Sequence, residues 1–335
     1  MAEQLAVTPE RIYQMVWGFA PPLILEAAIR HRVFDILDRG PQTLAEVARE
    51  SGASERGLRA IMDALVGFQF LAKEEERYTL TPESSAFLVT TKPSFQGGLL
   101  KHASSQLIPS WLSLTDVVRT GQPARGVNEE GHGAEFFREF VGDLFPMNFQ
   151  AAQAAGAALG LQTATEPVRV LDIAAGSGVW GIGLAQASPK VEVTAVDWPP
   201  VLEITQQFAQ RFGLADRFQY IAGDLMEVDY GTGYQAVTLG HILHSEGIDR
   251  SRQLIRKVYD ALASGGSVVI GEFLTNQERT GPIGGLIFAV NMVVNTTGGD
   301  AFSFEQIRGW LEEAGFKNVR SLEAPAPSPL ILATK

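Results

Sequence analysis

Short apolar runs alternate with helical apolar patterns through the second half of the chain. Residues 168–173 form an apolar, β-branched run, as a strand buried on both faces would show. A turn of small residues follows at 174–178, and apolar positions then recur at helical spacing over 180–187. A second β-branched run at 191–196 ends at Asp197. Strand, glycine turn, helix, strand and acid form the first unit of a nucleotide-binding, Rossmann-like sheet.

The same alternation continues towards the C-terminus. Further strands are predicted at 218–222, 236–240 and 267–271, and helices at 201–212, 249–262 and 303–314. Residues 316–322 and 329–334, joined by a proline-rich link, are typical of a closing hairpin. The pattern predicts an α/β fold with a Rossmann-like, doubly wound, mostly parallel sheet. In such sheets the ligand crevice lies at the carboxyl ends of the strands.

The first part of the chain is predicted to be helical, with the rhythm of a winged helix. Residues 9–37 give two helices whose broad apolar face suits packing against another subunit. Thr43 opens a helix with a capping box, a second helix spans 54–68, and two short strands flank the glutamates at 74–76. A wing of glutamates beside phosphate would be unfavourable. A structural or dimerising role is therefore favoured over DNA binding.

Residues 95–161 are predicted to be mainly helical and are rich in large apolar side chains. Ordinary core packing explains most of them, but their position just before the sheet also suits a lid over an apolar substrate. We therefore predict a winged-helix-like dimerisation domain over 1–95, a helical connector and substrate lid over 96–160, and a Rossmann-like catalytic domain over 161–335.

Composition narrows the class of protein. The 335 residues are 45% hydrophobic and 19% charged, which is typical of a globular protein with a core. A net charge of −11 argues against nonspecific binding to nucleic acid or anionic lipid. The absence of cysteine excludes disulfides and thiolate metal sites. No signal-peptide pattern and no run near 20 apolar residues is evident, so we expect a cytoplasmic protein without a membrane partner.

Two cofactors fit the glycine turn. The pattern G-x-G-x-x-G at 176–181, with Asp197 about 20 residues further on, suits a dinucleotide. Asp172 immediately before the turn suits S-adenosyl-L-methionine instead, because a carboxylate attracts a cationic amino-acid ligand and repels a pyrophosphate. The motif alone leaves both cofactors open.

Polar side chains also follow the other predicted strands. Asp197 would accept hydrogen bonds from both ribose hydroxyls, and Asp224 would accept one from an adenine amino group, with Leu225 against the ring. His244 is the natural general base, since histidine typically titrates near pH 6.5. Glu272, at the neighbouring strand end, would hold the other ring nitrogen of this histidine.

The spacing of His241 and His244 could also suggest a metal pair. The chain has no cysteine, and no acid pair lies nearby in the sequence, so no metal site is predicted.

Landmark motifs now make a family resemblance specific. The chain resembles the caffeate/acetylserotonin-type small-molecule O-methyltransferases, class I S-adenosylmethionine enzymes with a winged-helix dimerisation domain, over nearly its whole length. The matching motifs are LDIAAGSG at 171–178, VDWPP at 196–200, GDL at 223–225, HILH at 241–244, LASGG at 262–266, GEF at 271–273 and EEAGF at 312–316. The resemblance implies S-adenosyl-L-methionine as cofactor, a homodimer, and His244 taking a proton from the acceptor hydroxyl with Glu272 beside it.

Site residues follow from the strand ends and from this resemblance. Cofactor contacts are predicted at Asp172, Ala174, Gly176, Gly178, Asp197, Trp198, Asp224, Leu225 and Gly240. Acceptor contacts are predicted at His102, Asn291, Met292 and Asn295, and catalysis at His244 and Glu272. The chain departs from the family at Ala301, where a second flanking acid would fall beside Asp300, and at Gly240, where a polar or basic side chain is expected.

We therefore predict a dimeric S-adenosylmethionine-dependent methyltransferase that acts on a hydroxyl of a small aromatic or polyketide-like molecule. Methylation at carbon or nitrogen is a second hypothesis, which gains from Ala301. The glycine pattern also prompts a dehydrogenase, which Asp172 and the lack of a recognisable hydride-transfer domain disfavour. A catalytically inactive regulator that kept the cofactor fold is a further alternative, which the acidic wing disfavours.

Overall fold

The computed structural model of the protein describes residues 7–123, 126–127 and 130–335. The chain divides into two compact units, Met1–Pro109 and Ser110–Lys335, and α8 (Ile108–Trp111) crosses the boundary between them. The predicted domain boundaries near residues 95 and 160 were drawn from the expected roles of the segments and not from compactness, so they stay predictions.

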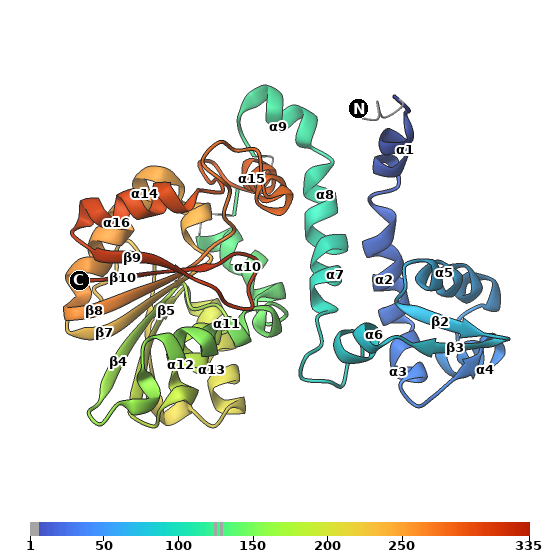
Figure 1. Ribbon diagram of the computed structural model, residues 1–335, viewed down its shortest axis with the longest axis horizontal. Coiled ribbons are helices and arrows are strands. Elements are labelled where there is room, and N and C mark those ends of the chain that lie inside the picture. The colour runs from blue at the N-terminus through green and yellow to red at the C-terminus, as the bar shows by residue number, and fades with distance from the viewer. Residues whose placement is uncertain (1–6, 124–125, 128–129) are drawn as a thin grey trace, which may run out of the picture. The chain divides into compact units, whose positions relative to one another are not determined.

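The first unit is helical with one small antiparallel sheet (Figure 1). Its helices are α1 (Glu10–Val16), α2 (Ala20–Arg30), α3 (Val33–Leu37), α4 (Leu44–Ser51), α5 (Glu55–Gly67), α6 (Pro82–Phe87), α7 (Gly98–His102) and a π-helical turn (Ala103–Leu107). The sheet has the order β1-β3-β2, from β1 (Gln42–Thr43), β3 (Arg77–Leu80) and β2 (Leu71–Glu74). The capping box predicted at Thr43 is confirmed, since its side chain accepts from Glu46 N–H while Glu46 reaches back to Thr43 N–H.

The N-terminal helices differ from the prediction. Three helices, not two, lie between residues 9 and 37, because Arg32 takes a left-handed conformation (φ 57°) that ends the helical run before α3. No stretch long and apolar enough to span a membrane was expected. The stretch Glu10–Arg30 differs from that expectation, because it could cross a membrane by length and composition alone. Most of this stretch is exposed within the described chain, and α1 buries none of its residues.

The second unit is a seven-stranded sheet covered by helices on both faces (Figure 1). Its strands are β4 (Val168–Ile173), β5 (Val191–Asp197), β6 (Phe218–Ala222), β7 (Tyr234–Gly240), β8 (Leu262–Gly271), β9 (Lys317–Leu322) and β10 (Leu330–Thr334). Its helices are α9 (Leu114–Thr120), α10 (Glu130–Phe140), α11 (Phe145–Ala158), α12 (Val179–Ala187), α13 (Pro199–Arg211), α14 (Leu243–Ala261), α15 (Ile283–Asn295) and α16 (Phe304–Ala314), with 3₁₀ turns at Leu161–Thr163 and Ala215–Arg217.

The strand order is β6-β5-β4-β7-β8-β10-β9, with the first five strands parallel and β10 antiparallel to both its neighbours. The doubly wound sheet and the closing hairpin are thus confirmed. The strands β4, β7 and β8 are apolar along their central residues because α11–α13 pack on one face and α14 with α16 on the other. Parallel register brings the carboxyl ends of β5, β4, β7 and β8 to one edge.

Two elements beside that edge differ from the prediction, one in its start and one in its existence. The helix α14 begins at Leu243, six residues before the predicted start, but it is interrupted at Gly247 (φ 71°, ψ 178°). A Cβ there would lie 2.5 Å from the carbonyl oxygen of Gly298, so only glycine fits this kink. The segment with His244 is therefore a separate turn ahead of the main helix. The apolar helix α15 was not predicted at all.

Candidate functional site

The glycine turn is held in place by Asp172, which lies one residue before the end of β4. This carboxylate is fully buried and accepts hydrogen bonds from Thr238 Oγ1 (2.6 Å) and from Gly181 N–H (2.9 Å). Burial raises the pKa of Asp172 to about 7, although both hydrogen bonds oppose that change. The contacts fix strand and helix around the turn. Direct contact of Asp172 with the cofactor stays a prediction.

The turn itself has the backbone that its small residues allow. Ala174, Gly176 and Gly178 have φ values of 53°, 57° and 74°, all in the left-handed region. This path aims Gly176 N–H at Asp197, whose Oδ2 accepts its hydrogen bond at 2.8 Å. The predicted turn residues and the predicted ribose acid are therefore brought together.

Asp197 is the last residue of β5 and carries the clearest cofactor signal. Its Oδ1 accepts from Trp198 N–H at 2.7 Å, so each carboxylate oxygen is oriented by one backbone donor. An ionised carboxylate has about four acceptor positions, which leaves one on each oxygen for the two ribose hydroxyls. Burial raises the pKa of Asp197 to about 6. The free acceptor positions of Asp197 therefore fit the ribose of an adenosyl group.

The loop after β6 presents Asp224 and Leu225. The carboxylate Oδ1 of Asp224 accepts from Met226 N–H at 2.7 Å and lies 3.6 Å from Arg250. The Lys257 ammonium holds the loop by donating to the carbonyl oxygens of Leu225 (2.9 Å), Met226 (3.0 Å) and Val228. The loop is thus fixed at the same sheet edge, and the predicted adenine contacts stay predictions.

The missing side chain at Gly240 has a structural explanation. A Cβ at Gly240 would lie 1.9 Å from the indole nitrogen of Trp180, and one at Gly271 would lie 2.7 Å from the same ring. The ring of Trp180, on α12, is buried against the ends of β7 and β8. The ring fills the space that a side chain at position 240 would need. This contact between Trp180 and position 240 could not be read from the order of residues along the chain.

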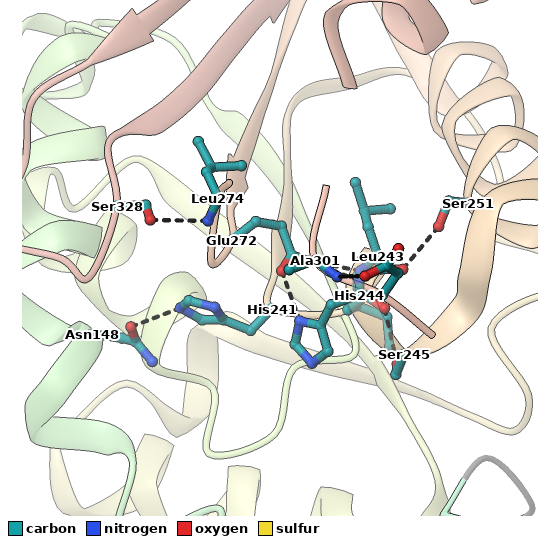
Figure 2. Close-up of polar contacts among 12 residues, drawn as sticks. Asn148, His241, Leu243, His244, Ser245, Ser251, Glu272, Leu274, Ala301 and Ser328 are labelled. Carbon is teal, nitrogen blue, oxygen red and sulfur yellow. Dashed lines mark hydrogen bonds and ion pairs between the residues drawn. The ribbon is translucent and has the colours of Figure 1, made fainter. Parts of the chain in front are cut away.

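The predicted catalytic pair is assembled (Figure 2). His244 Nδ1 and Glu272 Oε2 lie 2.7 Å apart, and Glu272 Oε1 accepts from the N–H groups of Leu243 (2.7 Å) and His244 (3.3 Å). Burial alone would raise the pKa of Glu272, but His244 and these hydrogen bonds outweigh it and hold the pKa below its usual value. Because His244 donates its Nδ1–H to Glu272, the Nε2 atom of the same imidazole keeps a lone pair that can accept a proton.

A second imidazole, that of His241, completes a cluster of three residues with His244 and Glu272. His241 has a left-handed backbone (φ 62°) and its Nε2 lies 3.0 Å from Asn148 Oδ1 on α11 (Figure 2). Its Nδ1 is buried and has no hydrogen-bond partner among the described residues. One ligand atom each from His241, His244 and Glu272 lie within 4.8 Å of one another. Glu272 was predicted beside His244 and the spacing of the two histidines was noted, but the contact of His241 with Asn148 had no signal in the sequence.

Position 301, where a second flanking acid was expected, carries alanine. Ala301 is fully buried, and its neighbour Asp300 turns to Arg279, with carboxylate–guanidinium distances of 2.8 and 3.0 Å. The Asp300 N–H nevertheless donates to His244 O at 2.9 Å, so this segment braces the backbone of the base. Asp300 therefore supplies a backbone contact and not a second acid.

Three of the four predicted acceptor residues lie on α15, and the fourth belongs to the first unit. Asn291 and Asn295 form a polar pair on α15, in which Asn291 Oδ1 accepts from Asn295 Nδ2 (3.0 Å) and from Trp111 Nε1 (2.8 Å). Met292 is buried on the same helix. His102 belongs to the first unit, where its Nδ1 lies 2.6 Å from Gln106 Oε1. Their contact with an acceptor stays a prediction.

Known proteins similar to this chain agree with the geometry. The family described as O-methyltransferase domain matches residues 111–317, and the O-methyltransferase dimerisation domain matches residues 13–90. A 3-hydroxy-5-methyl-1-naphthoate 3-O-methyltransferase of Streptomyces sahachiroi is 28% identical over 95% of this chain and 92% of its own. The tetracenomycin polyketide synthesis 8-O-methyl transferase of Streptomyces glaucescens is 27% identical over 98% and 97%. The crystal structure of a Nostoc punctiforme protein described as an O-methyltransferase superposes with a TM-score of 0.89, at 31% identity over 98% of this chain and 100% of that one.

Proposed function

This chain belongs to the O-methyltransferase family, and from that membership we propose that it methylates a hydroxyl group of a small aromatic or polyketide-like acceptor. It is a methyltransferase whose cofactor is S-adenosyl-L-methionine. The observation that carries the acceptor chemistry is the buried His244–Glu272 pair at the sheet edge that also presents Asp197.

The chain's own residues divide the work of binding and proton transfer. When bound, S-adenosyl-L-methionine supplies a methyl group on a positively charged sulfur. Asp197 would hold the ribose hydroxyls, while the turn at 174–178 places backbone beside them. His244 Nε2 accepts the proton of the acceptor hydroxyl, and the Glu272 carboxylate stabilises the imidazolium that results.

An aromatic surface beside His244 supports an aromatic acceptor. The Phe288 ring lies edge-on to His244 with centroids 4.8 Å apart, and it stacks on Phe273 at 4.0 Å. Planar rings pack well on such faces. The two Streptomyces relatives named above act, by their names, on a hydroxynaphthoate and in tetracenomycin synthesis.

The test of this proposal is where the methyl group goes. We expect purified protein with isotopically methyl-labelled S-adenosyl-L-methionine to label an oxygen of hydroxynaphthoate-type phenols, read by mass spectrometry and NMR. The matched acceptor with that hydroxyl replaced by hydrogen should remain unlabelled. Label on a ring carbon or an amine would overturn the O-methylation proposal.

Carbon or nitrogen methylation is the second candidate because of one observation. With Ala301 in place of an acid and Asp300 paired to Arg279, Glu272 is the one carboxylate among the described residues that is hydrogen-bonded to the imidazole of the base. A weaker proton-removing set suits acceptors whose nucleophile needs less activation. The product analysis above separates the two candidates directly.

The first unit supports a homodimer. Large apolar side chains on and after α1 are exposed within one chain, Ile12 and Trp17 each by 68%. Trp17 falls near the start of the stretch that matches the dimerisation domain, residues 13–90, and Ile12 lies just before it. An apolar face of this kind is stabilised when a second copy covers it.

We expect Val16→Asp with Trp17→Asp to convert a dimer into a monomer, because two charges would be buried in the interface. Light scattering coupled to size-exclusion chromatography measures the mass directly. Gln14→Glu, on the same exposed helix, is the matched control and should leave the dimer intact. A doubly substituted protein that still elutes as a dimer would place the interface elsewhere.

A further inference from the structure

We propose that His241, His244 and Glu272 form a binding site for a divalent transition-metal cation of the Zn²⁺ class, and that the bound ion inhibits methyl transfer. The metal site stands on the geometry of these three residues. Its inhibitory effect rests on the proposed role of His244 as the base.

The ligand set selects the kind of ion. Two imidazoles and one carboxylate make up a donor set that zinc uses in proteins, whereas Mg²⁺ and Ca²⁺ prefer oxygen ligands alone. Zinc lies about 2.0–2.2 Å from such ligands, which puts the ligand atoms about 3.5 Å apart in a tetrahedral site. Here they lie within 4.8 Å of one another, and the His244–Glu272 distance is 2.7 Å. Small side-chain rotations would therefore bring all three around one ion.

His241 already has the surroundings of a metal ligand. Its Nε2 faces Asn148 Oδ1, so the hydrogen sits on Nε2 and the buried Nδ1 presents an unused lone pair (Figure 2). Ligating histidines commonly donate their other ring N–H to such an outer partner.

Glu272 supplies the negative charge that balances the ion. It is buried, and its Oε1 is held by Leu243 N–H. A cation in this cluster takes up a lone pair of His244 and the charge of Glu272. The base can then no longer accept a proton, while Asp197 with its own backbone partners is untouched. The ion therefore blocks proton transfer and leaves cofactor binding intact.

The test begins with metal binding alone. We expect isothermal titration of the chelator-treated protein with ZnCl₂, without cofactor, to show one ion per chain, and MgCl₂ at the same concentration to show none. His241→Phe and His241→Gln should each weaken zinc affinity at least tenfold, since a third ligand is lost. The exposed histidine in His31→Asn is the matched control and should bind zinc like the unmodified chain.

Activity then separates the two proposals. Zinc at saturation should reduce the rate of acceptor methylation at least tenfold, reversibly on adding a chelator, with the affinity for S-adenosylhomocysteine unchanged. Turnover together with no zinc binding, or with zinc binding that both His241 variants leave unchanged, would overturn the metal site alone. Zinc binding that depends on His241 in a protein that methylates no hydroxyl would support the metal site and count against the proposed function.

Discussion

Replacing His244 by asparagine should lower kcat for hydroxyl methylation by about 10²- to 10⁴-fold, the range typical for loss of a general base. The asparagine amide can still approach Glu272, but it has no lone pair of comparable basicity to take the acceptor proton. Because the imidazole contacts Glu272 and the Phe288 ring, whereas Asp197 is held by its own backbone donors, cofactor affinity should stay within about twofold of the unmodified chain.

Single-turnover rates and S-adenosylhomocysteine titrations on the same preparation separate these effects. Glu272→Gln should give a smaller loss of kcat, since the amide oxygen can still accept from His244 Nδ1 but no longer stabilises the imidazolium by charge. His31→Asn removes an exposed imidazole and should change neither quantity. If His244→Asn kept kcat within threefold, positioning alone would account for the rate and the base would be unnecessary.

Much of the fold followed from local pattern because its causes are local. A strand buried on both faces needs a continuous apolar run, and β4 shows one. An acid that ends the second strand of a parallel unit must lie at the carboxyl edge, and Asp197 does. Strand register then carries His244 and Glu272 to neighbouring positions, since β7 and β8 pair in parallel with Gly240 opposite Gly271.

What could not be predicted depends on residues that meet only through the tertiary structure. Trp180 fills the space above Gly240 from another element, so an expected side chain at that position had no room. Asp300 was the nearest acid to Ala301 in sequence, but Arg279 pairs with its carboxylate. Asn148 orients His241 across a long sequence separation. In each case the missing information is a partner, and a partner leaves no trace in local periodicity.

The α15 helix escaped for a different reason. The helix is apolar on nearly every side, so its sequence has no amphipathic period that would distinguish it from a buried strand or an apolar loop. Ile283 and Ile287 remain well exposed on it while Met292 and Asn295 are buried. Intrinsic propensity does not decide whether such a sequence becomes a helix, a strand or a loop. Packing against the core of the second unit decides it.

Replacing Asp197 by asparagine should weaken S-adenosylhomocysteine binding about 10- to 100-fold. Hydrogen bonds to a charged group contribute about 1.5–3 kcal/mol each, and the amide of asparagine would also turn an N–H towards the donor of Gly176 or Trp198. Isothermal titration measures the change. Glu192→Gln is the matched control, because Glu192 is an exposed acid on the same strand and carries the same charge.

The loss of cofactor affinity at acid pH should come from the same carboxylate, that of Asp197. Burial raises the pKa of Asp197 to about 6 from an ordinary value of 3.8, so the ligand-free protein protonates it as the pH falls through 6. Only the ionised form can accept from both ribose hydroxyls while its two backbone donors stay bound. Affinity should therefore be full above pH 7 and about tenfold lower at pH 5, where about one carboxylate in ten is ionised. Asp197→Asn should remove this pH dependence as well as weaken the affinity, because the amide does not titrate in this range. A pH dependence that survives in that variant would assign the titrating group to another residue, with Asp172 the first to test because burial raises its pKa to about 7.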